Sequence, residues 1–404
     1  MMKKIATNYD FLKDIISIES YKENDKIKCS NRIAKELASI GFKVNVRTGY
    51  GSPIIYASYN AKTDKDILFY MHYDVKPAGD ISAWNTFPFK LHYDAKTDKF
   101  YGRGTGDDKG QIYAAVMGIK QAILSGEPLN YNINLLIEGD EESGSPGLET
   151  FVKKEIGSKF YDKVVVLDSH WLMDNPVIFL GCRGQLDVTI AYDDERMSND
   201  YHAGNFGGIY KGACRYLLRV MDKFLAEAEN IIDSFNIVGD VVKNDITNAI
   251  VTYDVKNAIS MTYYSSGDAK RSLIPKAATA KIDIRYVNVH VVKEILKLLD
   301  NYSNTYGIIY DINQREDGFY NRGNIQEISL IKHIIEKVTS LEVKVKDYCG
   351  GYLPLYKMRE INGNIYVIPL AQTDENNHAP NENISVDNVL YGVEIISKIL
   401  TYKL

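Results

Sequence analysis

The sequence predicts an α/β protein in which a mainly parallel sheet is sandwiched by helices and a smaller α+β domain is inserted. Three observations indicate this fold. The chain has 404 residues, which exceeds the roughly 250–300 residues at which one hydrophobic core stops growing. Its first 180 residues alternate β-rich and helical patterns, as a parallel sheet covered by helices does. From residue 181 this alternation changes, which predicts a second domain.

The first 180 residues contain the elements expected of the larger domain. Apolar residues recur at helical spacing in residues 27–40, where Gly41 ends the pattern, and again in residues 111–126. Between and after these helices, short β-rich runs predict buried strands. The runs are residues 67–75, 132–140 and 163–169.

The smaller domain is expected between residues 181 and 315, and residues 1–180 and 316–404 then form the larger one. A helical pattern at 325–338 returns the chain to the larger domain. Strands are predicted at 186–192, 278–287 and 307–313, and helices at 211–231 and 291–303.

Composition narrows the class of protein. With 45% hydrophobic and 25% charged residues the chain is an ordinary globular protein, and a net charge of −5 argues against a nucleic-acid partner. Apolar runs are too short for a membrane span, and Asn8 and Asp10 interrupt any secretory signal. The four cysteines form no CxxC pair, so we expect reduced thiols and a cytoplasmic protein.

Polar residues follow the predicted strands, at the ends where open α/β sheets place their sites. His72 and Asp74 stand two residues apart after the first β-rich run. An imidazole can bind a metal there while the carboxylate orients it. The alternative interpretation is a turn histidine beside a solvated aspartate.

The segment 102–110 is rich in glycine and precedes a helix. It lacks the spacing of a phosphate-binding loop, and Asp107 and Asp108 would repel a phosphate. The glycines instead predict a tight backbone path that directs Asp107 into a pocket. The alternative is a flexible, charged loop.

Consecutive acids at Asp140, Glu141 and Glu142 end another β-rich run. Crowded carboxylates raise one another's pKa unless cations hold them together, so this cluster predicts two metals and one glutamate that accepts a proton. The alternative is an exposed acidic turn. Asp168 follows four apolar residues, and His378 lies in an Asn-rich loop where a solvated histidine is the alternative.

Taken in order, these motifs resemble the co-catalytic zinc metallopeptidases. The motifs are HYDV, GRGTGDDKG, EGDEESGS, VVVLDSHW and NHAPNEN, and NDYHAGNFGG, SSGDAKRSLIPKA and KIDIRYV resemble motifs of the family's lid domain. The family includes carnosinase, cytosolic non-specific dipeptidase, aminoacylase, acetylornithine deacetylase and succinyl-diaminopimelate desuccinylase. The carnosinase-like branch fits best, and the resemblance runs from about residue 65 to residue 385.

The resemblance implies a role for each matching residue. It implies two divalent metal ions, most simply zinc with manganese or cobalt as alternatives, and a catalytic domain whose inserted domain serves as lid and dimer interface. Metal ligands would be His72, Asp107, Glu142, Asp168 and His378, with Asp107 shared by both metals. Catalysis would use Glu141 as general base and acid, Asp74 to support His72, and His202 of the partner subunit in a homodimer to stabilise the oxyanion. Substrate contacts would come from Arg285, His202, Ser272 and Gly351.

The implied activity is hydrolysis of the amide bond of dipeptides or small peptides, of the dipeptidase or carboxypeptidase type, by a metal-bound hydroxide. An N-acyl amino acid deacylase uses the same chemistry and stays an alternative, as does a catalytically silent binding or scaffold protein. The chain departs from the family at Tyr352, which stands where relatives have a serine. The resemblance and the glycines at 102, 104 and 106 also predict a cis peptide bond between Asp107 and Asp108.

Overall fold

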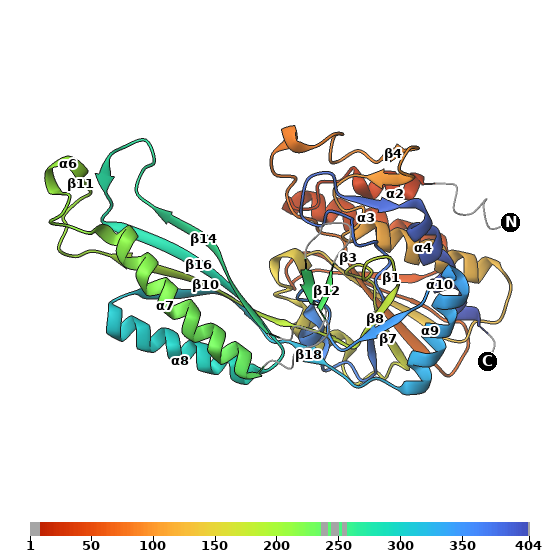
Figure 1. The fold of residues 1–404 in the computed structure, drawn as a ribbon. Helices are drawn as coiled ribbons and strands as arrows, with labels where there is room; N and C mark the ends of the chain where they lie inside the picture. The colour runs from red at the N-terminus through yellow and green to blue at the C-terminus, as the bar shows by residue number, and fades with distance from the viewer. Residues whose placement is uncertain (1–8, 236–240, 244–249, 253–256, 403–404) are drawn as a thin grey trace. The chain divides into compact units, whose positions relative to one another are not determined.

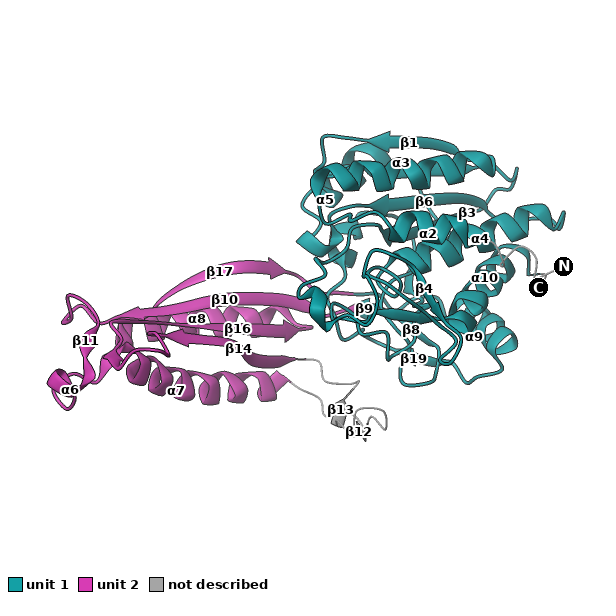
Figure 2. Cartoon of the chain, turned by 90° about the horizontal axis from the view of Figure 1, so that it is seen from above, with its two compact units in different colours: residues 1–181, 320–404 teal, residues 182–319 magenta. Residues whose placement is uncertain are grey.

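The computed structural model describes residues 9–235, 241–243, 250–252 and 257–402. The chain divides into two compact units (Figure 2), unit 1 with residues 1–181 and 320–404 and unit 2 with residues 182–319. The sequence placed these boundaries after residues 180 and 315, and the second unit ends instead at Phe319. None of the described helices combines the length and the apolar character needed to cross a bilayer.

Unit 1 is built around an eight-stranded sheet in the order β1-β2-β6-β3-β7-β20-β8-β19. Four neighbouring pairs are parallel, namely β6–β3, β3–β7, β7–β20 and β8–β19. This confirms the α/β class with a mainly parallel sheet. The strands span Lys43–Arg47 (β1), Ile54–Tyr59 (β2), Asp66–His72 (β3), Asn132–Glu138 (β6), Lys163–Val166 (β7), Val177–Phe179 (β8), Lys344–Lys346 (β19) and Ile365–Val367 (β20).

Helices cover both faces of this sheet because the side chains of its strands alternate between two apolar layers. On one face Ile67, Phe69 and Met71 join the main core together with residues of five helices, whose ribbons are drawn in Figure 1. On the other face Phe151 packs edge-on against Tyr56 of β2 with ring centroids 6.1 Å apart. The helices are α2 (Asp10–Ile16), α3 (Glu23–Ser39), α4 (Lys109–Leu124), α9 (Ile325–Thr339) and α10 (Val386–Thr401) on the first face and α5 (Leu148–Phe151) on the second.

A glycine allows α4 and α10 to pack closely. A Cβ atom at Gly118 would lie 2.6 Å from the carbonyl oxygen of Val393, closer than two such atoms approach. A small three-stranded sheet has the order β21-β5-β4. Its strands are His92–Asp94 (β4), Lys99–Tyr101 (β5) and Asn383–Ser385 (β21). Along the chain, β5 is the element before α4 and β21 is the element before α10.

Unit 2 contains a four-stranded antiparallel sheet in the order β14-β16-β10-β17, with two helices packed against it around a core of its own. The strands are Gly184–Asp193 (β10), Ala258–Ser266 (β14), Ala277–Tyr286 (β16) and Ile309–Glu316 (β17). The helices are Gly212–Phe235 (α7) and Val289–Tyr306 (α8). A short pair, Tyr201–His202 (β11) with Leu273–Ile274 (β15), extends the unit beyond one end of the sheet (Figure 1).

The order of the strands in unit 1 determines at which edge of the sheet the predicted site residues lie. Strands β6 and β7 both pair in parallel with β3, so the segments that follow all three leave the same edge of the sheet. These segments carry the polar clusters after His72, Glu138 and Val166.

Candidate active site

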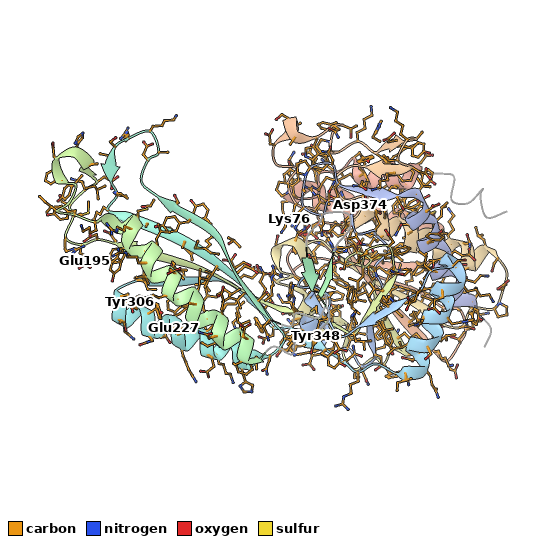
Figure 3. All side chains as sticks on the ribbon, in the orientation of Figure 1. Lys76, Glu195, Glu227, Tyr306, Tyr348 and Asp374 are labelled. Carbon is orange, nitrogen blue, oxygen red and sulfur yellow. The ribbon has the colours of Figure 1, made fainter. Side chains whose placement is uncertain are left out.

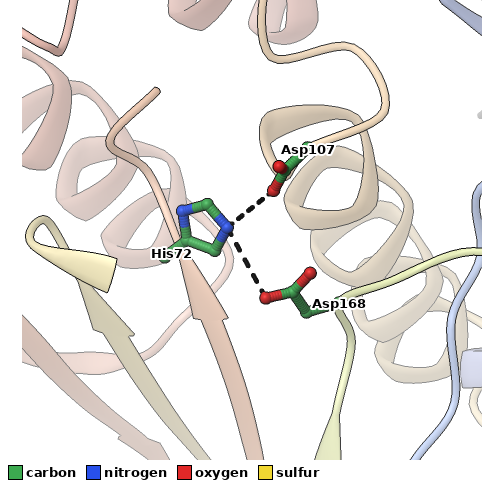
Figure 4. A group of neighbouring side chains, drawn as sticks. All are labelled: His72, Asp107 and Asp168. Carbon is green, nitrogen blue, oxygen red and sulfur yellow. Dashed lines mark hydrogen bonds and ion pairs between the residues drawn. The ribbon is translucent and has the colours of Figure 1, made fainter. Parts of the chain in front are cut away.

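The first group of site residues is His72, Asp107 and Asp168 (Figure 4). The Nε2 atom of His72 lies 2.8 Å from Oδ1 of Asp107 and 3.6 Å from Oδ2 of Asp168. All three side chains are buried. Each offers one ligand atom within 4.8 Å of the others, which is a spacing that could hold one metal ion.

A second group shares Asp107 with the first. The Nε2 atom of His378 lies 3.0 Å from Oδ2 of Asp107 and 3.0 Å from Oε1 of Glu142. Asp107 therefore directs one carboxylate oxygen to each histidine, and Asp107, Glu142 and His378 form a second group that could hold a metal. The structure thus brings together all five residues predicted as metal ligands.

Asp74 holds the two glutamates and the first histidine in place. Its Oδ1 atom lies 3.3 Å from Nδ1 of His72. Its two oxygens accept the backbone N–H groups of Glu141 at 3.2 Å and of Glu142 at 3.0 Å. One carboxylate therefore fixes the orientation of an imidazole and the position of the acidic turn.

The turn itself is anchored from the other side. Asp140 accepts hydrogen bonds from the backbone N–H of Ser52 and from Lys26 Nζ, each at 2.6 Å. Lys76, labelled in Figure 3, lies with its Nζ atom 3.1 Å from Oε2 of Glu142. Within the described part of the chain, the carboxylate of Glu141 has no hydrogen-bonding partner, which leaves it available.

The electrostatics show an excess of carboxylates. Burial, with the charge of Asp107 added, raises the pKa of Asp168 to about 7. Desolvation, then the charges of Asp168 and Glu142, raise the pKa of Glu141 well above its ordinary value. Burial alone would lower the pKa of His72, but its hydrogen bonds to Asp107 and Asp74 raise it well above the usual range.

Asp107 shows the opposite balance. Burial would raise the pKa of its carboxyl group, but the hydrogen bonds with His378 and His72 lower that pKa strongly. The anionic form is therefore favoured for the one residue shared by both groups. Imidazole nitrogens and carboxylate oxygens in two adjoining clusters fit a pair of divalent cations, because cations offset the crowding that raises the other pKa values.

The glycine loop 102–108 gives Asp107 its position. Gly102 and Gly104 have φ angles of +151° and +90°, where other residues are strained. The predicted cis peptide bond between Asp107 and Asp108 is present.

Two residues behind the site were missed by sequence reasoning. Arg103 and Glu382 form a buried ion pair at 2.6 Å. Both stand inside the motifs that resemble the family, each four positions from a predicted ligand (Asp107 and His378), and a charged residue in each motif was the available signal.

The remaining predicted site residues lie in three different parts of the structure. In unit 2 the β11–β15 pair brings His202 next to Ser272, whose carbonyl oxygen accepts the N–H of Ala203 at 2.9 Å. Arg285 lies on β16, where its Nε atom is 2.7 Å from Asp283. In unit 1 Gly351 is exposed.

Unit 2 does not bring Arg285 near His202. His202 pairs with Leu273 of β15, and a short turn connects β15 to Ala277, the first residue of β16. From Ala277 to Arg285 this strand extends about 26 Å at about 3.3 Å per residue. The two residues therefore stand at opposite ends of the sheet.

Comparisons with known proteins agree on one family. The model described as peptidase family M20/M25/M40 matches residues 68–402. The Cys-Gly metallodipeptidase DUG1 of Candida albicans is 26% identical over 400 residues, covering 87% of this chain and 81% of that protein. The human Beta-Ala-His dipeptidase is 26% identical over 395 residues, covering 85% and 76%.

Solved structures show the same fold. The di-peptidase Dug1p from Saccharomyces cerevisiae superposes with a TM-score of 0.80 at 21% identity, over 98% of this chain and 96% of that one. Human carnosine dipeptidase 1 gives a TM-score of 0.78 at 22% identity, over 98% and 97%.

Proposed function

The chain belongs to peptidase family M20/M25/M40, and from this premise we propose that it is a metal-dependent hydrolase that cleaves the amide bond of dipeptides or small peptides. The observation that carries the proposal is the carboxylate of Asp107, which faces His72 with one oxygen and His378 with the other. Relatives named as a metallodipeptidase and a dipeptidase support the substrate class.

The residues of the site suit two metal ions. His72 and Asp168 would hold one, Glu142 and His378 the other, and Asp107 both. Zinc suits this set of nitrogen and oxygen donors, with manganese or cobalt as alternatives. When bound, such cations would polarise the scissile carbonyl group and lower the pKa of a water from 15.7 to about 7.

Glu141 is the residue we assign to proton transfer. Its neighbour Glu142 faces His378, whereas the carboxylate of Glu141 is free of partners among the described residues. Burial and the neighbouring charges raise the pKa of its carboxyl group, which favours acceptance of a proton from water. Glu141 would take the proton of the attacking water and then give it to the leaving amine.

The inserted unit supports a homodimer. A two-residue peptide spans about 7 Å when extended, but about 26 Å of strand separates the positions of His202 and Arg285 in one chain. If both contact one substrate, as the resemblance implies, one of them comes from a second chain, which a twofold arrangement allows. Ser272 would accompany His202, and Gly351 would contribute from unit 1.

A cytoplasmic location completes the proposal. The four cysteines are widely spaced and form no CxxC pair in the sequence, a pattern that fits a reducing compartment better than a disulfide framework.

Metal analysis with a substrate panel tests the function. The purified protein should contain two metal equivalents and hydrolyse dipeptides faster than N-acetyl amino acids. Faster cleavage of the N-acetyl compounds would favour the deacylase. Two bound metals without turnover on either class would favour a silent binding protein.

A further inference from the structure

A buried ion pair lies behind the candidate metal centre and touches neither of its two groups of ligand atoms. Arg103 Nη1 donates to Oε2 of Glu382 at 2.6 Å, and the side chains are 2% and 0% exposed. Neither residue belongs to the groups that could hold a metal among the described residues. The other contacts of the pair therefore decide its role.

Glu382 accepts hydrogen bonds from three backbone N–H groups of the glycine loop. Its second oxygen, Oε1, accepts the N–H groups of Gly104 at 2.9 Å, of Gly106 at 3.0 Å and of Asp107 at 3.0 Å. Hydrogen bonds to an ionised carboxylate are roughly twice as strong as neutral ones. Because one of these donors is the amide of Asp107 itself, Glu382 fixes the place from which the shared carboxylate projects.

Arg103 reaches two other segments of the site with its second terminal nitrogen. Nη2 donates to the carbonyl oxygen of His378 at 3.2 Å and to that of Pro77 at 3.4 Å. His378 has a φ angle of +59°, which is uncommon outside glycine. The hydrogen bond from Arg103 to its carbonyl group therefore helps to hold His378 in this backbone conformation.

We propose that Arg103 and Glu382 are positioning residues that set the spacing between Asp107 and His378. The Oδ2 and Nε2 atoms of these two ligands lie 3.0 Å apart, and each ligand is tied to one member of the ion pair. The pair thereby controls the affinity of the second metal group, formed by Asp107, Glu142 and His378. This inference rests on the proposed two-metal function.

Arg103→Lys tests the proposal. Lysine keeps the charge beside Glu382, but it lacks the planar fork that reaches Glu382 and the carbonyl oxygen of His378 together. The metal-free protein is titrated with cobalt(II), and binding is followed by calorimetry and by the visible absorption of the bound metal. We expect the first equivalent to bind as in the wild type and the second about 10-fold or more weaker, with a changed spectrum.

A matched control separates positioning from a general loss of stability. Lys163 is buried and pairs with Tyr131 at 2.8 Å and Glu327 at 3.3 Å, at the end of β7 that is remote from Asp168. Lys163→Met should lower the melting temperature yet leave both cobalt equivalents and the spectrum unchanged. Equal weakening of both equivalents in Arg103→Lys would overturn the proposal, as would unchanged binding.

Glu382→Gln gives a second, independent measurement. Its amide oxygen still accepts the loop N–H groups, but its NH₂ group faces Arg103, so the same selective loss of the second equivalent is expected. If Arg103→Lys does not fold, unchanged cobalt binding by Glu382→Gln refutes the proposal. If neither variant folds, the pair serves stability alone and the proposal is wrong. A wild type that binds no cobalt refutes the proposed function itself, whereas two equivalents that bind every variant as tightly as the wild type refute only this inference.

Discussion

Asp74→Asn should weaken metal binding without changing any residue that faces a metal. The carboxylate of Asp74 contacts Nδ1 of His72 at 3.3 Å and accepts the N–H groups of Glu141 and Glu142. Asparagine is nearly the same size but has one acceptor oxygen where aspartate has two. At least one of the three groups would then face an NH₂ group, which cannot accept its hydrogen.

The size of the effect follows from that loss. Leaving a buried donor without an acceptor costs about 1–3 kcal/mol, which corresponds to roughly 5- to 150-fold in an equilibrium constant. Loss of a partner that orients a metal ligand falls within this range, at about 10–100-fold in metal affinity. We therefore expect metal dissociation constants to rise by about 10-fold or more.

Competition titration of the metal-free protein with a chelator of known affinity measures this change. Asp80→Asn is the control, because the side chain of Asp80 is exposed and accepts hydrogen bonds from Ser82, two residues further along the chain. If Asp74→Asn binds metal as tightly as Asp80→Asn does, Asp74 does not orient the site and the reasoning is refuted.

Three further outcomes are expected. Glu141→Gln should keep its metal content but lose at least ~10²-fold in turnover, as a positioned acid–base does; loss of one metal equivalent in elemental analysis would mean that Glu141 and Glu142 have exchanged roles. Mixing inactive His202→Ala with inactive Glu141→Gln should restore activity once mass measurement shows heterodimers, because one site then has only wild-type residues; heterodimers that stay inactive contradict action in trans. Burial raises the pKa of Glu138 from 4.5 to about 7, so its neutral form stabilises the metal-free fold below pH 4.5 and this contribution is lost as pH rises through 7. The free energy of unfolding of Glu138→Gln and of the wild type is measured with urea at pH 5 and pH 8. Its fall between the two pH values should be smaller in Glu138→Gln, by up to about 3 kcal/mol. An equal fall in both proteins would show that Glu138 is not a source of the pH dependence.

The strands at the centre of the large sheet could be predicted because their apolar runs are buried on both faces. Residues 132–140 and 163–169 contain β6 and β7, and residues 67–75 contain all of β3 except its first residue, Asp66, although the strands end at His72, Glu138 and Val166. Strands β19 and β20 have three residues each and carry too little pattern to detect. Their pairing depends on partners elsewhere in the chain.

The candidate site likewise has one part that could be predicted from the sequence and another that could not. The five proposed metal ligands stand in motifs that can be read locally, so their grouping at one site could be predicted. The role of Arg103 depends on Glu382, which is 279 residues away, and on three backbone amides whose direction only the folded loop defines. A contact of that kind leaves no periodicity in the sequence. The separation of Arg285 from His202 likewise follows from the length and pairing of β16, not from either motif.

The position of β20 in the sheet has a consequence for synthesis of the chain. This strand, Ile365–Val367, lies between β7 and β8, and both partners leave the ribosome long before it does. Residues 182–319 form a unit with its own core, so they can fold while the larger unit still lacks an inner strand, as domains commonly fold one by one during translation. His378 and Glu382 emerge later still. A nascent chain that ends before residue 378 therefore carries four of the five proposed metal ligands and lacks the histidine of the second group. A protein truncated before β20 should expose the unpaired edges of β7 and β8 and aggregate.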